Sequence, residues 1–362
     1  MTTTPLRVGV IGVGFGSAVH IPGFLSEGVQ VVAVCARRQE RAEKAAKDFG
    51  IPHVFTDYRQ LLEMRDLDAV SIASPPAVHY EMTMAALDAG KHVLCEKPFA
   101  LDQRQAKDMA DKAARTGRTA MVAHEFRFAP ARAYVKELIS QGYVGKVQAV
   151  HVYLFRGPTE PRTRLPARGT QAADGGGFLW SLGAHYIDGL RDWVGDVTKV
   201  CGATFVQEPN RLDSATGQTV ATDADDGFSF IATLAGGGWA SMSASSAAPF
   251  GPGALLQVYG TEGTLQTPQP GVNPPSDGKV LGARFGEGKG LHELPMPDRF
   301  RPFADARDDR LLAFRILVRT FVEGIAKGES PAPNFYDGYR CQQVMDAVRA
   351  SMNGGGWVTI AK

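Results

Sequence analysis

Lys97 is the residue whose type and position best suit acid–base chemistry. It lies in Glu96-Lys97-Pro98, directly after the apolar run His92 to Cys95, and Ser74-Pro75-Pro76 follows the preceding run, Ala69 to Ala73, in the same way. Open α/β sheets bind ligands at the carboxyl ends of their strands. A lysine there can hydrogen-bond a hydroxyl group and relay its proton while a hydride leaves the same carbon. A strand-end lysine can also be a solvated charge, so its position alone leaves both interpretations open.

A glycine-rich turn follows the first apolar run, Leu6 to Ile11, and opens a helix-like segment. Its sequence is Gly12-Val13-Gly14-Phe15-Gly16-Ser17. In a dinucleotide-binding turn the first glycine permits the sharp bend and the second lets the backbone approach a pyrophosphate, which the helix N–H groups and dipole stabilise. The third small position falls on Ser17, with Gly16 one residue early. A turn without ligand is the alternative, but this context favours a cofactor site formed by Gly12, Gly14, Phe15, Gly16 and Ser17.

The end of the second apolar run indicates which dinucleotide binds. An acidic residue about 20 positions after the glycines usually binds the adenine ribose hydroxyls, but this sequence has Cys35-Ala36-Arg37-Arg38. Arginine side chains can bind a 2′-phosphate with two parallel hydrogen bonds. We therefore predict NADP as the cofactor, held by Arg37 and Arg38, with NAD as the alternative. Both arginines could instead cap the next helix in solvent.

Six apolar runs alternate with helix-like segments over residues 1–124, which predicts an α/β Rossmann domain with a doubly wound parallel sheet. The predicted strands are Leu6 to Ile11, Val29 to Cys35, His53 to Phe55, Ala69 to Ala73, His92 to Cys95 and Thr119 to Ala123.

Residues 125–362 have a different pattern, with a helix at Ala131 to Ser140, a long strand at Lys146 to Phe155 and several strand-like runs with few helices between them. They predict an α+β domain with a large, mostly antiparallel open sheet. The Pro- and Gly-rich stretch Thr267 to Lys289 is expected to be an exposed excursion. Two helices, Leu311 to Ala326 and Asp337 to Ser351, follow it.

Composition limits the possible partners. The 362 residues include 44% hydrophobic and 21% charged side chains, and the formal net charge is +1. This balance gives no global field that would attract nucleic acid or an anionic membrane. The cysteines and histidines lack metal-ligand spacing, so no metal site is expected. The first residues do not resemble a secretory signal, and we expect a cytoplasmic protein.

Several motifs together resemble the Gfo/Idh/MocA family, which includes glucose–fructose oxidoreductase and inositol dehydrogenase. They are GVGFGS, SPP with His79 three residues later, AGKHVLCEKP, EFRF with Pro130, and GGGFLWSLGAHYID. The resemblance implies a Rossmann domain for NAD(P) and a second domain for the substrate and often for oligomer contacts. It implies that Lys97 contacts the reacting hydroxyl and that His185 shares the proton transfer. It also adds Ser74, Pro75, His79, Glu96 and Lys97 to the expected cofactor site.

The helix after Gly177 departs from the family pattern. Inositol dehydrogenase-like members have Asp-x-Gly-x-His here, whereas this sequence has Ser181-Leu182-Gly183-Ala184-His185. In a regular α-helix Ser181, His185 and Asp188 would share one face. A serine offers only a neutral hydrogen bond, which weakens a polyol assignment but keeps Ser181 and His185 as predicted substrate contacts.

Arginines near the same motif suggest an acidic substrate. Arg127 lies at the expected domain junction, and the loop before Gly175 contains Arg156, Arg162, Arg164 and Arg168. If some of them point inward, the substrate could carry a carboxylate, as a sugar acid does. A solvated loop is the alternative. The predicted substrate site therefore consists of Lys97, Arg127, Arg168, Ser181 and His185.

The resulting hypothesis is an NAD(P)-dependent dehydrogenase or reductase that acts on the CH–OH group of a sugar, sugar acid or related polyol. Lys97 and His185 would handle the hydroxyl proton. One alternative is a non-catalytic dinucleotide-binding sensor, and another is a nicotinamide-dependent glycoside hydrolase. An open sheet with one apolar face makes a homodimer or homotetramer the expected assembly.

Overall fold

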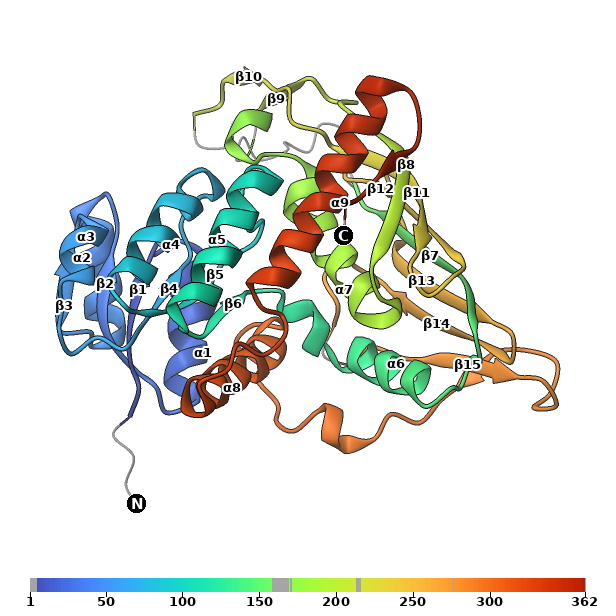
Figure 1. Ribbon diagram of the computed structural model, residues 1–362, viewed down its shortest axis with the longest axis horizontal. Coiled ribbons are helices and arrows are strands. Elements are labelled where there is room, and N and C mark those ends of the chain that lie inside the picture. The colour runs from blue at the N-terminus through green and yellow to red at the C-terminus, as the bar shows by residue number, and fades with distance from the viewer. Residues whose placement is uncertain (1–4, 158–168, 170, 213–215, 276, 362) are drawn as a thin grey trace. The chain divides into compact units, whose positions relative to one another are not determined.

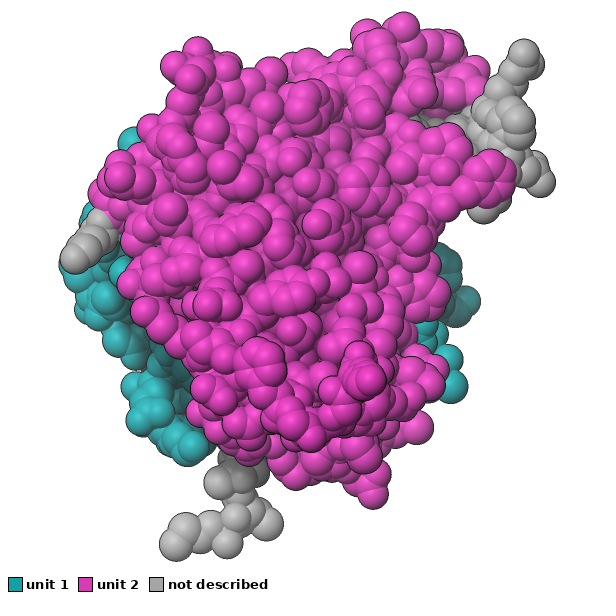
Figure 2. All heavy atoms as spheres, turned by 90° about the vertical axis from the view of Figure 1, so that its right-hand side faces the viewer, with its two compact units in different colours: residues 1–125, 305–342 teal, residues 126–304, 343–362 magenta. Residues whose placement is uncertain are grey.

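The computed structural model describes residues 5–157, 169, 171–212, 216–275 and 277–361. Arg162, Arg164 and Arg168 lie outside the described residues. The chain divides into two compact units (Figure 2), unit 1 with residues 1–125 and 305–342 and unit 2 with residues 126–304 and 343–362. The division thus groups residues 305–342 with the N-terminal part of the chain. The domain boundary expected at 124/125 stays a prediction.

Unit 1 contains a six-stranded parallel sheet in the order β3-β2-β1-β4-β5-β6 (Figure 1). Each strand lies within the range predicted from the sequence, and this order is that of the Rossmann fold. The doubly wound parallel sheet is therefore confirmed. The strands are β1 (Arg7–Ile11), β2 (Gln30–Cys35), β3 (His53–Phe55), β4 (Ala69–Ile72), β5 (His92–Cys95) and β6 (Ala120–Val122).

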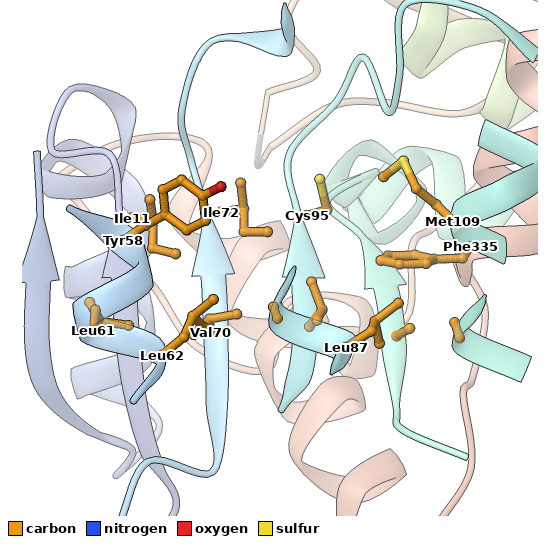
Figure 3. Close-up of a cluster of buried hydrophobic side chains, with 14 of the residues drawn as sticks. Ile11, Tyr58, Leu61, Leu62, Val70, Ile72, Leu87, Cys95, Met109 and Phe335 are labelled. Atoms are coloured by element: carbon orange, nitrogen blue, oxygen red, sulfur yellow. The ribbon is translucent and has the colours of Figure 1, made fainter. Parts of the chain in front are cut away.

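Helices cover both faces of this sheet, which explains why its strands are almost continuously apolar. Figure 3 shows one side of the resulting core, where Leu61, Ile72, Leu87 and Phe335 are among the buried side chains. The helices of unit 1 are α1 (Ile21–Ser26), α2 (Gln39–Phe49), α3 (Tyr58–Leu62), α4 (His79–Asp88), α5 (Gln103–Thr116), α8 (Leu311–Lys327) and the first part of α9 (Phe335–Gly354).

Helix α5 illustrates how the sequence specifies these elements. Asp102 caps its start by accepting a hydrogen bond from the backbone N–H of Gln105 at 2.8 Å, and Gly117 ends it in the left-handed conformation with φ 63°. Its buried residues are Ala106, Met109 and Ala113, which follow the helical repeat and form one apolar stripe.

Unit 2 contains a nine-stranded sheet in the order β16-β15-β14-β13-β7-β12-β11-β8-β17. Only β7 and β12 pair in parallel within it, so the predicted mostly antiparallel sheet is confirmed. Its strands are β7 (Val147–Phe155), β8 (Val197–Phe205), β11 (Gly227–Leu234), β12 (Trp239–Ser245), β13 (Gly253–Gly260), β14 (Gly263–Gln269), β15 (Leu281–Arg284), β16 (His292–Glu293) and β17 (Val358–Thr359). Strands β9 (Asn210–Leu212) and β10 (Thr219–Ala221) form a separate pair.

Helices α6 (Pro130–Ser140) and α7 (Ala184–Val194) lie on one face of this sheet (Figure 1). Alternate residues of β11, such as Phe228 and Phe230, are buried against that side. Among the described residues of unit 2 no helix lies over the opposite face, which bears half-exposed Tyr153, Ile231 and Trp239.

The expectation of an exposed excursion over Thr267 to Lys289 is wrong for much of that stretch. Strand β14 continues to Gln269, and β15 pairs with it from Leu281 to Arg284. Thr267, Gln269, Val272 and Val280 are all buried. Proline and glycine mark turns in a sequence, but they do not show that the chain between two turns returns to the sheet. Within the described residues, no helix is both long and apolar enough to span a membrane.

Candidate active site

The three glycines of the turn after β1 have different structural surroundings. Gly12 has φ 104°, and a Cβ there would lie 2.4 Å from the carbonyl oxygen of Ala73, so no side chain fits. Apart from its chain neighbours, no described residue has an atom within 4 Å of the corresponding position at Gly14, so a ligand can approach this backbone. A Cβ on Gly16 would lie 3.0 Å from Cγ1 of Val10. The close helix–strand contact of the third small residue therefore falls on Gly16, rather than on Ser17.

Two serine hydroxyls near this turn are buried without a hydrogen-bond partner among the described residues. They are the Oγ atoms of Ser17 and of Ser74, which follows β4. Native proteins satisfy nearly all buried polar atoms, so such atoms often mark a ligand or water position. Pro75, the next residue of the predicted site, is exposed before the short helix η2 (Pro76–Val78).

Phe15 has a neighbour that the sequence did not indicate. The guanidinium of Arg310 lies 4.9 Å from the centre of the Phe15 ring, and its Nε and Nη2 atoms donate hydrogen bonds to Asp308 at 2.8 and 2.5 Å. Nearly 300 positions separate the two residues in the sequence, so no local motif could reveal this contact. The structure thus adds a cation from the 305–342 segment to the glycine turn of unit 1.

Arg37 and Arg38 follow β2 and are exposed. Neither side chain makes a hydrogen bond or ion pair with another described residue. Arg38 precedes α2 at the N-cap position without capping it through its side chain. The alternative role as a helix cap therefore has no support, and both guanidinium groups can bind an anion.

His79 connects two loops through hydrogen bonds. Its ring nitrogens lie 2.9 Å from the carbonyl oxygens of Ser74 and Pro98, and the side chain is fully buried. Burial lowers the pKa of His79 more than these carbonyl groups raise it. These contacts fix the loops after β4 and β5, and the contact of His79 with the cofactor stays a prediction.

Glu96 is also occupied within the protein. Its Oε1 lies 2.9 Å from Nε2 of His20, and its Oε2 accepts a hydrogen bond from the backbone N–H of Lys97 at 3.1 Å. Burial raises the pKa of Glu96, but the hydrogen bond and charge of His20 and the charge of Lys97 bring it below its ordinary value. Glu96 therefore stays ionised. The sequence did not indicate His20, which lies in an apolar segment.

Lys97 is half-buried beyond the end of β5, and its peptide bond to Pro98 is cis. Strand β6 runs beside β5, with the N–H of Ala123 donating to Cys95 O at 2.8 Å. This pairing brings Glu125, which is buried, to the same edge of the sheet. Burial and the charge of Glu96 raise the pKa of Glu125 to about 8, although Lys97 opposes the shift. A basic side chain, an ionised carboxylate and a protonated carboxyl thus gather at one edge.

In unit 2, the glycine run before His185 forms a turn closed by Asp225. A Cβ on Gly176 would lie 2.3 Å from Gly169 O, and Gly177 has φ 118° with its Cβ position 2.2 Å from Oδ1 of Asp225. Oδ2 of Asp225 accepts hydrogen bonds from the backbone N–H groups of Phe178 at 2.9 Å and Leu179 at 2.8 Å. Burial raises the pKa of Asp225 to about 6, although these hydrogen bonds lower it. The carboxyl caps the helical segment that carries His185.

That segment begins as a π-helix, η5 (Leu179–Gly183), before α7. Ser181 is exposed, whereas His185 and Asp188 are buried, so the face predicted from α-helical spacing is not shared by all three. The wider π turn changes the angle between successive residues. The His185 ring stacks on Phe126 at 3.8 Å between centroids, with an interplanar angle of 7°.

Arg127 binds two carboxylates of the protein itself. Its Nε and Nη2 atoms donate to Asp188 at 2.6 Å each, and Nη1 donates to Asp192 at 3.0 Å. These contacts engage the guanidinium that was expected to meet a substrate carboxylate. Arg156, the described arginine of the following loop, is exposed with its guanidinium 5.6 Å from the Phe178 ring, whereas the predicted contact Arg168 lies outside the described residues.

Two family models match the chain in succession. The model for the oxidoreductase family with an NAD-binding Rossmann fold matches residues 6–124, and the GFO/IDH/MocA C-terminal domain matches residues 133–266. An uncharacterized oxidoreductase of Synechocystis sp. is 31% identical over 99% of this chain and 98% of its own. The chain belongs to the GFO/IDH/MocA family of oxidoreductases.

Other GFO/IDH/MocA relatives extend over the whole chain. Levoglucosan dehydrogenase of Pseudarthrobacter phenanthrenivorans is 28% identical over 98% of each chain. A solved structure of levoglucosan dehydrogenase in complex with NADH and levoglucosan covers 99% of this chain and 100% of its own, with 25% identity and a TM-score of 0.87. The family resemblance, the fold class and the assignment as a dehydrogenase are thus confirmed.

The GFO/IDH/MocA cofactor fits the residues that the structure places at the glycine turn. Open space at Gly14 accommodates a pyrophosphate, and the unsatisfied hydroxyls of Ser17 and Ser74 offer hydrogen bonds. Arg310 adds positive charge beside Phe15. These residues would hold the dinucleotide, while His79 and Glu96 support the surrounding loops.

Proposed function

We propose that this protein is a sugar dehydrogenase, which transfers a hydride between a nicotinamide dinucleotide and a hydroxyl-bearing carbon of a sugar or sugar derivative. The placement of Lys97 supports the reaction, because it lies beyond β5 beside one ionised and one protonated carboxyl group. The carbohydrate substrate is supported by the likeness to levoglucosan dehydrogenase over the whole chain.

The proposed site residues have different roles in the oxidation of an alcohol. The bound nicotinamide supplies the hydride acceptor. Lys97 donates a hydrogen bond to the hydroxyl oxygen and stabilises the negative charge that develops there, while His185 takes the proton that this oxygen loses as the carbonyl forms. Stacking on Phe126 fixes the ring plane of His185, and the exposed Ser181 offers a neutral hydrogen bond to another hydroxyl. Arg168 remains a proposed substrate contact, whereas the hydrogen bonds of Arg127 to Asp188 and Asp192 support a structural role for it.

We assign NADP as the preferred dinucleotide, with NAD as the alternative. The end of β2 lacks the carboxylate that binds ribose hydroxyls, and Arg37 and Arg38 are exposed with no hydrogen-bond or ion-pair partner among the described residues. Arg37→Ala is expected to weaken NADPH binding about tenfold or more, the loss of one charge-assisted contact, and to leave NADH binding nearly unchanged. Calorimetric titration with both cofactors measures this difference, and equal losses would contradict the assignment.

Turnover is tested by following nicotinamide absorbance with a panel of sugars, sugar acids, anhydrosugars and inositols. We expect net reduction of the cofactor with at least one member, and Lys97→Ala is expected to abolish it while cofactor affinity stays within about threefold. Turnover of the variant at the original rate would refute the role of Lys97. Binding of cofactor without any turnover would favour a sensor, and release of a sugar without net redox change would favour a glycoside hydrolase.

The open face of the nine-stranded sheet is the proposed contact with a second copy of the chain. His151 lies there among Tyr153, Trp239 and Tyr259, with ring centroids 4.8 to 6.1 Å away, and Ile231 is 43% exposed. Large aromatic and aliphatic groups on one flat surface are typical of homodimer interfaces. Light scattering of wild type and Ile231→Glu tests this contact, because the variant should dissociate; an unchanged mass would contradict it.

A further inference from the structure

A chain of buried polar groups connects the glycine turn with the loop of Lys97. Ser71 Oγ lies 2.7 Å from Nδ1 of His20, and Nε2 of His20 lies 2.9 Å from Oε1 of Glu96. The other carboxylate oxygen accepts the backbone N–H of Lys97 at 3.1 Å. Ser71 and His20 are fully buried, and Glu96 is 6% exposed. Each step is a direct contact within unit 1.

His20 lies on the segment that leaves the cofactor turn. The π-helical turn η1 (Gly16–His20) begins at the last glycine of the motif and ends at His20. Two aromatic rings hold the imidazole in place, Phe15 at 5.5 Å and Phe314 at 4.4 Å between centroids. Its ring nitrogens are thereby directed at Ser71 and Glu96, so the position of the glycine turn also sets the position of this donor.

The contact with His20 keeps a buried carboxylate charged. An unpaired carboxylate in such surroundings is strongly destabilised and takes up a proton instead. Burial alone raises the pKa of Glu96, and the hydrogen bond and charge of His20 more than reverse this effect, with Lys97 and His79 contributing further. Without His20, Glu96 would tend to protonate, and the Lys97 ammonium would lose a neighbouring negative charge.

We propose that His20 is a positioning residue for Lys97, acting through Glu96. It orients the carboxylate that holds the Lys97 backbone and keeps its negative charge beside the lysine amine. This inference rests on the proposed role of Lys97 in catalysis. A purely packing role would be served as well by an apolar side chain of similar size, which could not donate to Glu96.

The reactivity of the Lys97 amine tests this proposal without turnover. Trinitrobenzenesulfonate modifies only the neutral amine, and mass spectrometry of the peptide that contains Lys97 measures its rate in the cofactor-free protein. We expect His20→Leu and Glu96→Gln to increase this rate about threefold or more, because each removes negative charge beside the amine. His20→Gln keeps an amide N–H near the position of Nε2 and should return the rate to within about twofold of wild type.

The matched control is Phe314→Leu, which loosens the packing on the same imidazole but leaves its hydrogen bonds. It should lower the melting temperature without changing the labelling of Lys97. An equal rise in the labelling rate of Lys97 in Phe314→Leu and His20→Leu would overturn the proposal, because the loss of packing alone would then explain both. If His20→Leu does not fold, Glu96→Gln and His20→Gln decide the outcome by the same labelling rates.

Kinetics provide a second measurement if wild type turns over a sugar. His20→Leu should lower kcat about tenfold, with a Kd for NADPH within about threefold of wild type, since the open backbone at Gly14 is unaffected. An unchanged kcat in a folded variant would refute the positioning role. Absence of turnover in wild type would instead count against the sugar dehydrogenase, while the labelling experiment would still test His20.

Discussion

Replacing Arg127 by methionine should reduce the free energy of unfolding by about 3 to 5 kcal/mol, because it removes two hydrogen bonds and a positive charge from the buried carboxylate of Asp188. The side chains of Arg127 and Asp188 are 6% and 1% exposed, and two hydrogen bonds of 2.6 Å join them. Two unit charges about 4 Å apart interact with about 4 kcal/mol at an effective dielectric constant near 20, which agrees with this range. Methionine retains most of the apolar stem, so little of the loss comes from packing.

Urea denaturation followed by tryptophan fluorescence measures this loss. Asp188→Asn keeps the volume of the second partner, and the double variant should recover part of the stability lost by Arg127→Met, because position 188 then carries no charge. Arg299→Met is the matched control for an exposed pair, since Arg299 binds Glu137 with 59% of its side chain exposed. It should cost less than about 1 kcal/mol.

Measurements of unfolding free energy and of KM together can refute the structural role of Arg127. If Arg127→Met loses less than about 1 kcal/mol and strongly raises KM for a sugar acid but not for a neutral sugar, Arg127 serves the substrate, as its sequence position first suggested. Loss of stability with equal effects on both substrates would support the structural role.

Three further changes test other parts of the structure. Gly12→Ala should lower both the melting temperature and NADPH affinity, because its Cβ would meet Ala73 O at 2.4 Å with φ at 104°; a melting temperature equal to that of wild type would contradict this geometry. Gly14→Ala has open space and should remain folded while calorimetry shows weaker NADPH binding, whereas unchanged affinity would remove Gly14 from the site. The pKa of Asp225 is raised from 3.8 to about 6 in the folded protein, so its contribution to stability is fully present below pH 3.8 and is lost as the pH rises through 6. Between pH 4.5 and 7.5, urea titrations should show wild type losing about 2 kcal/mol of unfolding free energy relative to Asp225→Asn. Parallel pH profiles of the two proteins would contradict the shifted pKa.

Local patterns were sufficient for most of the fold. The strands of unit 1 are apolar runs because helices cover both faces of their sheet, and the turn at Gly12 was recognisable because glycine alone adopts its conformation without strain. The family motifs likewise identified the edge that bears Lys97. These features depend on residues close together in the sequence, so periodicity and spacing could reveal them.

The remaining features depend on contacts between distant residues. His20 looked like part of an apolar helix until its contacts with Ser71 and Glu96 were known. Arg127 looked like an anion-binding residue, because the sequence does not show that Asp188 occupies its guanidinium. Asp225 lies nearly 50 positions after the glycine run that it caps. A polar residue that serves a distant backbone group leaves no periodic signal near itself.

The grouping of residues 305–342 with unit 1 has a consequence for the order of events during synthesis. Phe314 would collide with a Cβ on Gly23, so it packs directly against the N-terminal unit, and the Phe335 ring lies 4.6 Å from that of Phe99. Ribosomes add about 5 to 20 residues per second, so about 10 to 40 s pass between the emergence of Glu125 and that of Gln342. During this interval the nascent dinucleotide-binding unit lacks two of its aromatic core residues, so the apolar surfaces that they later cover are still exposed.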